Sequence, residues 1–165
     1  MADWILKLPM KEIIEVSRAY NLPGNLLAAI IQKESSGNVN AIRFEPAYKY
    51  FWDAKDNAQK LNCSLETELT MQACSIGLTQ VMGAVCREYG FKGWLSELFQ
   101  VKLNLQYGAK HLQKYVKKHS FLNDAIAAYN AGSPRLAAGG KYVNQAYVDS
   151  VLSNKAELDK KIVSS

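Results

Sequence analysis

The sequence has few of the residues that build disulfide-stabilised or metal-binding folds. Its 165 residues include only three cysteines, Cys63, Cys74 and Cys86, and two histidines, His111 and His119. An odd cysteine count without a CxxC pair argues against a disulfide framework and a zinc cluster. We therefore expect three free, small and buried thiols, no metal site and no cofactor.

Long apolar stretches are also missing. The longest run, Leu26–Ile31, is far shorter than the roughly 20 residues that span a bilayer, so we expect no stable membrane insertion. The N-terminus, MADWILKLPMKEII, has an acid at Asp3 and no basic flank before an apolar core. No signal peptide is visible. We expect synthesis in a bacterial host cytoplasm, with delivery to the site of action by other means.

The composition is that of an ordinary folded domain with an excess of positive charge. Hydrophobic residues make up 48% and charged residues 21% of the chain, and the net charge is +5, with a pI near 9.0. Such a charge favours a polyanionic neighbour, which is a nucleic acid, a membrane surface or a cell-wall polymer.

Helical periodicity covers most of the chain, and no segment alternates as a strand does. We predict helices over residues 10–20, 24–36, 66–73, 101–118, 122–131 and 142–158, with a longer one starting at Gly77. The absence of strands excludes a βαβ unit or a Rossmann phosphate loop. We predict one mainly α domain over residues 1–165.

The helix expected over residues 24–36 ends with a carboxylate on its apolar face. Leu27, Ile30 and Ile31 recur at helical spacing, and Glu34 continues their stripe. Burial raises the pKa of a carboxyl group, which is how proteins make a general acid. The alternatives are that Glu34 reaches solvent or pairs with Lys33 or Arg43.

Two other segments place polar groups at the ends of apolar helix faces. Tyr129 and Asn130 end one such face, and Gln80 lies in the first turns of the helix expected from Gly77. Each has a structural alternative, as a core aromatic, a cap or a surface amide. Three such groups together suggest one cleft between helices, where ligand sites tend to lie.

These segments resemble the soluble lytic transglycosylase catalytic domain, which is related to goose-type lysozyme. QKESSGN (32–38) is similar to the family's Glu-Ser helix end, GLTQVM (77–82) to its Gly-Leu-Met-Gln motif and AAYNAG (127–132) to its Ala-Tyr-Asn-Ala-Gly motif. NLQYGAKHLQKY resembles the helix between the last two, and RFEPAYKYF resembles a segment of phage-borne members. The likeness covers about residues 22–138. Thr79, in place of the usual Met, and Gly83, in place of Pro, depart from it.

The resemblance implies a lysozyme-like helical fold and cleavage of the bond between N-acetylmuramic acid and N-acetylglucosamine in peptidoglycan. Glu34 would be the general acid and then the base, and the muramic acid would leave as a 1,6-anhydro sugar. Ser35, Gln80, Tyr129 and Asn130 would position Glu34 and the sugar. The Tyr129 hydroxyl would bond to Glu34 or to the substrate's N-acetyl group.

Glu45 leaves a second reaction open. It follows Glu34 by eleven residues and can reach across the cleft as a second catalytic acid. If it orients water, the protein is an inverting muramidase, as goose-type lysozymes are. The alternative is a structural carboxylate that pairs with Arg43 or a lysine.

Two classes of non-enzymatic protein are alternatives to these two enzymatic hypotheses. A nucleic-acid-binding protein would need a coherent basic stripe, whereas the lysines here are scattered, so we expect no nucleic-acid partner. A wall-binding or virion structural module would not need Glu34, Gln80 and Tyr129 intact. We expect a monomer that binds peptidoglycan glycan strands.

Overall fold

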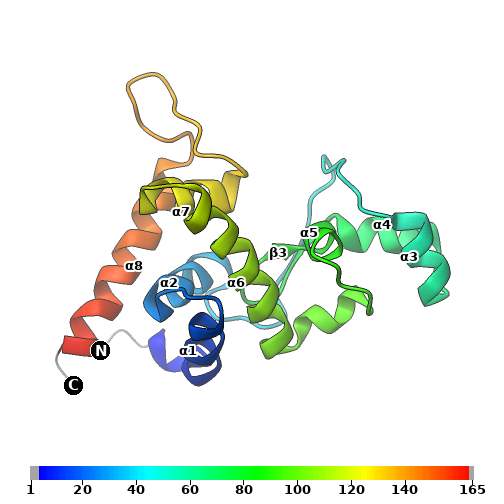
Figure 1. Cartoon of the computed structure of the whole chain (residues 1–165), viewed down its shortest axis with the longest axis horizontal. Coiled ribbons are helices and arrows are strands. Elements are labelled where there is room, and N and C mark those ends of the chain that lie inside the picture. The colour runs from blue at the N-terminus through cyan, green and yellow to red at the C-terminus, as the bar shows by residue number, and fades with distance from the viewer. Residues whose placement is uncertain (1–3, 164–165) are drawn as a thin grey trace.

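Most of the chain folds into helices, as the periodicity predicts (Figure 1). The computed structural model describes residues 4–163. The α-helices are Met10–Ala19 (α1), Gly24–Ser35 (α2), Ala54–Leu61 (α3), Leu65–Gln72 (α4), Gly83–Glu88 (α5), Val101–Lys118 (α6), Leu122–Ala131 (α7) and Gln145–Val163 (α8). Two 3-10 helices, Ile5–Lys7 (η1) and Leu95–Phe99 (η2), complete the helical elements of the described residues.

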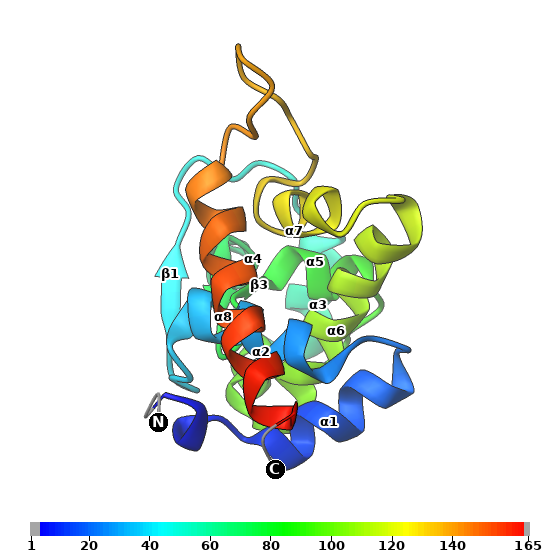
Figure 2. The same cartoon turned by 90° about the vertical axis from the view of Figure 1, so that its left-hand side faces the viewer.

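The larger lobe is built around α2. Its residues Leu26–Ile31 are fully buried, because α2 packs along α8 and also contacts α1. Helices α1, α2, α6, α7 and α8 together supply one continuous apolar core. Figure 2 shows α8 running across the front of this lobe. A helix this apolar on all sides is stable only when neighbours cover it completely.

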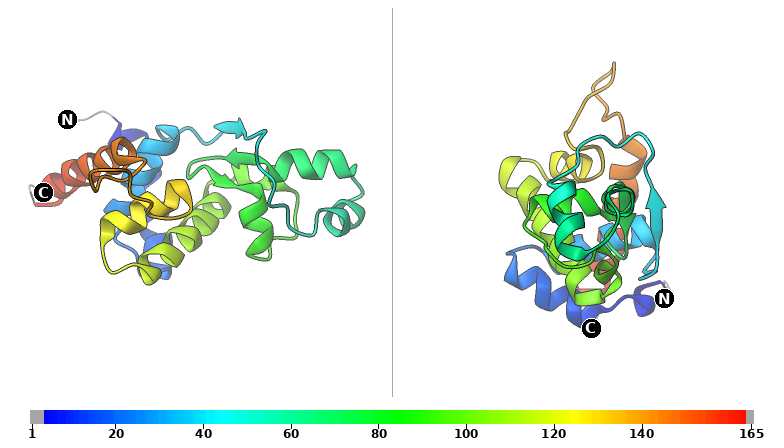
Figure 3. Two further views of the ribbon diagram at one scale, coloured as in Figure 1. Left: turned by 90° about the horizontal axis from the view of Figure 1, so that it is seen from above. Right: turned by 90° about the vertical axis from the view of Figure 1, so that its right-hand side faces the viewer.

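The smaller lobe contains α3, α4, α5, η2 and a short sheet, and it has its own apolar core. The two lobes lie next to each other along the long axis of the molecule, with α6 between them (Figure 3). Cys74 and Cys86 are buried here as free thiols, as expected, and Cys63 is free but only partly buried.

The expectation of a chain without strands is wrong for this lobe. Ile42–Phe44 (β1), Cys74–Ile76 (β2) and Val81–Met82 (β3) form an antiparallel sheet in the order β1-β2-β3. Each strand has two or three residues, which is too short for an alternating pattern to be recognised.

The helix expected from Gly77 is also wrong, because residues 77–80 form the turn between β2 and β3. Gly77 (φ +70°) and Gln80 (φ +48°) both adopt the left-handed conformation, which a helix excludes. The buried side chain of Asn104 stabilises this turn. It donates to the carbonyl of Ile76 (2.8 Å) and accepts from the backbone N–H of Thr79 (2.9 Å). Helix α5 therefore begins only at Gly83.

The last helix begins later and extends further than residues 142–158. Leu136 and Tyr142 form an isolated antiparallel bridge, so the chain makes a small hairpin before α8 begins at Gln145. This hairpin projects from the larger lobe (Figure 1). Within residues 4–163, none of the helices has the length and apolar character needed to cross a membrane.

Candidate active site

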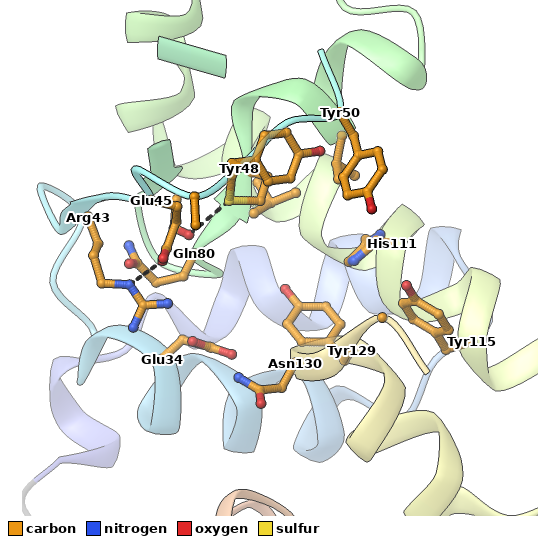
Figure 4. Close-up of a pocket in the computed structure, with 16 residues that line it drawn as sticks. Glu34, Arg43, Glu45, Tyr48, Tyr50, Gln80, His111, Tyr115, Tyr129 and Asn130 are labelled. Atoms are coloured by element: carbon orange, nitrogen blue, oxygen red, sulfur yellow. Dashed lines mark hydrogen bonds and ion pairs between the residues drawn. The ribbon is translucent and has the colours of Figure 1, made fainter. Parts of the chain in front are cut away.

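A cavity of about 470 Å³ lies where the two lobes face each other. Four of the residues expected at the site line it: Glu34, Gln80, Tyr129 and Asn130. Glu45 lines it as well (Figure 4). The structure thus gathers five of the six predicted side chains around one cavity, and Ser35 lies outside its lining.

Glu34 is held at the last turn of α2, partly buried. The helix ends there because Ser36 and Gly37 take left-handed conformations. Burial raises the pKa of Glu34, whereas the hydrogen bond from Tyr147 and the charges of Arg43 and Lys33 oppose that rise. The net effect is a raised pKa, so Glu34 keeps its proton to a higher pH than an exposed glutamate does, and a general acid must hold its proton at the start of a reaction.

Tyr147, on α8, is the partner of Glu34 that the sequence analysis missed. Its hydroxyl donates to Oε1 of Glu34 over 2.6 Å, and its ring is buried. The only sequence signal is its place on the apolar stripe with Val148 and Val151, which is also typical of a core tyrosine. The bond between Tyr147 on α8 and Glu34 on α2 depends on how the two helices pack, so the local sequence does not reveal it.

Tyr129 does not bond to Glu34, which was one of the two alternatives that the resemblance implied. Its hydroxyl donates to the carbonyl of Thr79 over 2.8 Å. That bond ties α7 to the turn between β2 and β3 and places the ring in the cavity wall. The tyrosine hydroxyl that bonds to Glu34 is that of Tyr147.

Ser35 has a related structural role. Its hydroxyl lies 2.8 Å from the carbonyl of Leu78 and 3.2 Å from that of Ile31. Ser35 therefore connects the end of α2, next to Glu34, to the turn between β2 and β3.

The side-chain amides of Gln80 and Asn130 line the cavity, and hydrogen bonds hold both of them in place. Gln80 Nε2 donates to the carbonyls of Gly77 (2.9 Å) and Ala41 (3.1 Å). Asn130 Oδ1 accepts from Asn144 Nδ2 over 2.9 Å. Both side chains are thus preorganised at the rim of the cavity.

Glu45 pairs with Arg43, as the structural alternative predicted. Arg43 Nε lies 2.5 Å from Glu45 Oε1, and 69% of the Arg43 side chain and 34% of the Glu45 side chain are exposed. Both residues line the cavity beside Glu34 (Figure 4). The end of the cavity that holds Glu34 therefore carries one further carboxylate, whose charge is balanced by a guanidinium group.

The other end of the cavity is aromatic, and its histidine is uncharged at neutral pH. His111 Nδ1 lies 3.0 Å from the Tyr89 hydroxyl, and its ring contacts Tyr115 and Tyr129. Burial, together with the charge of Lys114, lowers the pKa of His111 to about 4. Among residues 4–163, no cluster of three or more His, Cys, Asp or Glu side chains could hold a metal ion.

The fold and the site together define a class of protein. A mainly helical domain with a partly buried carboxyl of raised pKa at a cavity between two lobes is consistent with a lysozyme-like fold. The family model of the Transglycosylase SLT domain matches residues 11–149. The chain belongs to this family, and the match extends beyond the 22–138 expected from the motifs. Family membership implies peptidoglycan as the substrate. Searches of curated proteins and of solved structures found no match.

Proposed function

We propose that this protein is a lytic transglycosylase that cleaves peptidoglycan between N-acetylmuramic acid and N-acetylglucosamine. The observation that carries the proposal is Glu34: a carboxyl with a raised pKa at the cleft wall, in a chain of the Transglycosylase SLT family. The net charge of +5 suits binding to the anionic polymers of a bacterial cell wall. That the protein is phage-encoded or virion-associated stays a prediction, based on the likeness of RFEPAYKYF to phage-borne members.

In the proposed reaction, Glu34 first gives its proton to the glycosidic oxygen, and the bond from that oxygen to C1 of the muramic acid breaks. The N-acetyl carbonyl of the substrate stabilises C1, as in substrate-assisted glycosidases. The Glu34 carboxylate then removes the proton of the C6 hydroxyl, and O6 bonds to C1. Glu34 ends protonated, and no water is consumed.

Three features of the site support the use of one carboxyl for both steps. The hydrogen bond from Tyr147 stabilises Glu34 while it is charged between the two steps. Burial keeps its proton affinity high. Glu45, the other glutamate that lines the cavity, is engaged by Arg43.

An inverting muramidase is the second candidate, because Glu45 lines the same cavity as Glu34. In that reaction, Glu45 would activate a water molecule on the far face of the sugar, and the product would keep a reducing end. The two candidates share Glu34 as the acid and differ in the nucleophile.

The test compares release of soluble fragments from purified peptidoglycan by the wild type and by Glu34→Gln. Glutamine keeps the shape but has no transferable proton, so we expect the rate to fall by about two to four orders of magnitude. Glu66→Gln, which changes an exposed carboxyl of α4 outside the cavity, is the matched control and should retain activity. Near wild-type release by Glu34→Gln would remove Glu34 from the mechanism. Wall binding by a wild type that releases nothing would favour a structural module.

A further inference from the structure

The small sheet ends in an open edge at β1. The strand order β1-β2-β3 leaves one side of β1 without a neighbouring strand within residues 4–163, and all three residues of β1 are exposed. The strand lies at the periphery of the molecule in Figure 2 and in the right-hand view of Figure 3. Such an edge presents unpaired backbone N–H and C=O groups, to which another strand can bond.

The pairing with β2 determines which backbone groups of β1 are unpaired. The N–H of Glu45 donates to the carbonyl of Ala73 (2.9 Å), on the side of β2. Along an antiparallel pair, hydrogen-bonded and non-hydrogen-bonded positions alternate, so the N–H and C=O of Phe44 point away from β2. The same holds for Ile42, two residues earlier. The open side of β1 therefore offers the backbone groups of Ile42 and Phe44.

The side chains of this edge alternate between charged and apolar. Arg43 and Glu45 lie on the face that lines the cavity, two residues apart and opposite in charge. Phe44 lies between them in sequence, and therefore on the other face of the strand, with 53% of its surface exposed. The edge thus carries a cation and an anion on one face and an exposed aromatic ring on the other.

We propose that β1 pairs antiparallel with β1 of a second copy of this chain, about a two-fold axis at Phe44. In this register the two Phe44 residues exchange both backbone hydrogen bonds, and Arg43 of each copy lies directly opposite Glu45 of the other. Non-hydrogen-bonded positions bring side chains closest, and opposite charges that face each other there stabilise the pair. A two-fold interface must be self-complementary. A cation and an anion two residues apart on one strand meet that condition.

Other registers of the same pairing fit less well. With the axis at Arg43, the two guanidinium groups face each other, and like charges directly opposite are destabilising. With the axis at Ile42, Arg43 faces Ala41 and no ion pair forms. Pro46 has no N–H and ends the pairing after Glu45. The contact is therefore short, and the dimer should form and dissociate readily, as small interfaces do.

This interface adjoins the cavity, because Arg43 and Glu45 line it beside Glu34 (Figure 4). In the monomer the two form an ion pair, with 69% of the Arg43 side chain exposed, so the guanidinium group can bond to a second carboxylate. The second copy then brings its own Glu45 and Arg43 to the charged end of the cavity. At low concentration, the chain should be the monomer that the sequence predicts.

The experiment is sedimentation equilibrium of the full chain over a wide range of concentration. The mass of the wild type should rise from 18.4 kDa toward twice that value. Arg43→Glu and Glu45→Arg each set like charges against each other, which is strongly unfavourable at an interface, so each should weaken the dimer about a hundredfold or more. An equimolar mixture of the two variants should dimerise again, because every acid then faces an arginine. Glu15→Arg changes the net charge as Glu45→Arg does, in an exposed pair with Lys102 outside β1, and should dimerise as the wild type does.

Phe44→Pro tests the backbone part of the pairing. The N–H of Phe44 points outward, so proline removes no bond of the monomer and is tolerated on an edge strand. This variant should keep the wild-type thermal midpoint and lose the dimer.

Three results would overturn the proposal: a wild type that stays monomeric at every concentration, a dimer that persists in all three β1 variants, or a mixture of the two charge variants that stays monomeric. If the wild type is monomeric and the amide resonance of Phe44 shifts when peptidoglycan peptides are added, an extended peptide is the occupant of this edge instead. None of these measurements depends on cleavage of peptidoglycan, so the proposed function is tested separately.

Discussion

The hydroxyl of Tyr147 donates a 2.6 Å hydrogen bond to Oε1 of Glu34, across 113 positions of the chain. It joins the last turn of α2 to the first turn of α8 at the cavity wall. Burial raises the pKa of Glu34, and this bond is the largest of the interactions that oppose the rise. We therefore expect Tyr147 to position Glu34 and to influence how readily its carboxyl gives up a proton.

Tyr147→Phe should lower kcat and move the alkaline limb of its pH profile upward. Without the hydroxyl, the charged form of Glu34 loses a stabilising bond, so its pKa rises and it stays protonated to higher pH. The fall in kcat should be about tenfold or more, because a hydrogen bond to a charged group contributes about 1.5–3 kcal/mol. The measurement is the pH dependence of fragment release from peptidoglycan.

The matched control is Tyr142→Phe, which removes a tyrosine hydroxyl bonded to Asp124 rather than to Glu34. It should leave the alkaline limb where it is in the wild type. An unchanged pH profile in Tyr147→Phe would show that the bond to Glu34 has no catalytic consequence.

Glu34→Gln should stabilise the protein at neutral pH while abolishing its activity. The pKa of Glu34 is raised in the folded state above its ordinary value of 4.5. Protonated Glu34 therefore stabilises the folded state at a pH below the pKa that Glu34 has in the unfolded chain. This stabilisation is lost as the pH rises through the pKa of Glu34 in the folded state. Glutamine is never charged, so it avoids that loss, and it can still accept the bond from Tyr147.

Urea unfolding of both proteins between pH 4 and pH 8 measures this effect. The advantage of Glu34→Gln in free energy of unfolding should grow from acid to neutral pH. A constant difference, or one that grows toward acid, would contradict a raised pKa at Glu34.

The position of Glu34 was predictable from local pattern, whereas its partner was not. The stripe of Leu27, Ile30 and Ile31 places Glu34 on the buried face of one helix, which is information contained in a few neighbouring residues. The bond from Tyr147 depends on how α8 crosses α2. A buried tyrosine that bonds to a carboxyl at a cavity has the same periodicity as one in a core.

The helix predicted from Gly77 was wrong for a different reason, which the turn at residues 77–80 shows. Leu78, Val81, Met82 and Val85 have helical spacing, so the local pattern favoured a helix. The chain instead pairs Val81 with Ile76 across the sheet. Side-chain bonds from the distant Asn104 stabilise the turn, and such long-range competition is invisible in a short window of sequence.

Glu68→Gln should strongly destabilise the smaller lobe. Arg87 and Glu68 form a salt bridge with 0% and 3% of their side chains exposed. Glu68 also accepts a hydrogen bond from Gln72, whose amide in turn bonds to the backbone of Trp52. Removing one charge leaves the other buried without compensation, which costs about 3–5 kcal/mol. The free energy of unfolding in urea is the measurement.

Glu15→Gln provides the control, because the pair of Glu15 with Lys102 is exposed and such pairs contribute about 0–1 kcal/mol. Changing Glu68 and Arg87 together to Met should recover much of the stability, since no buried charge then remains. If Glu68→Gln costs no more than Glu15→Gln, the buried pair is not a determinant of stability.

Glu45 decides between the two enzymatic candidates. Arg43 holds its carboxylate at the cavity wall, which suits a group that positions substrate. If O6 of the muramic acid attacks C1, no water enters the product. Fragments should then be lighter by one water than those from a lysozyme, and borohydride should not reduce their anhydro ends. Mass spectrometry before and after borohydride treatment makes this measurement.

Under that mechanism, Glu45→Gln should slow the reaction about tenfold, or about 1.4 kcal/mol of barrier, and still yield anhydro products. The amide keeps the size of the side chain and weakens only its attraction to Arg43. If Glu45 instead activates water, the wild-type products carry ordinary reducing ends, and Glu45→Gln loses nearly as much activity as Glu34→Gln. We expect the anhydro product, because the raised pKa and the tyrosine partner of Glu34 suit two successive proton transfers, whereas Glu45 is already bonded to Arg43. Products that are fully reducible by borohydride would establish the muramidase in its place.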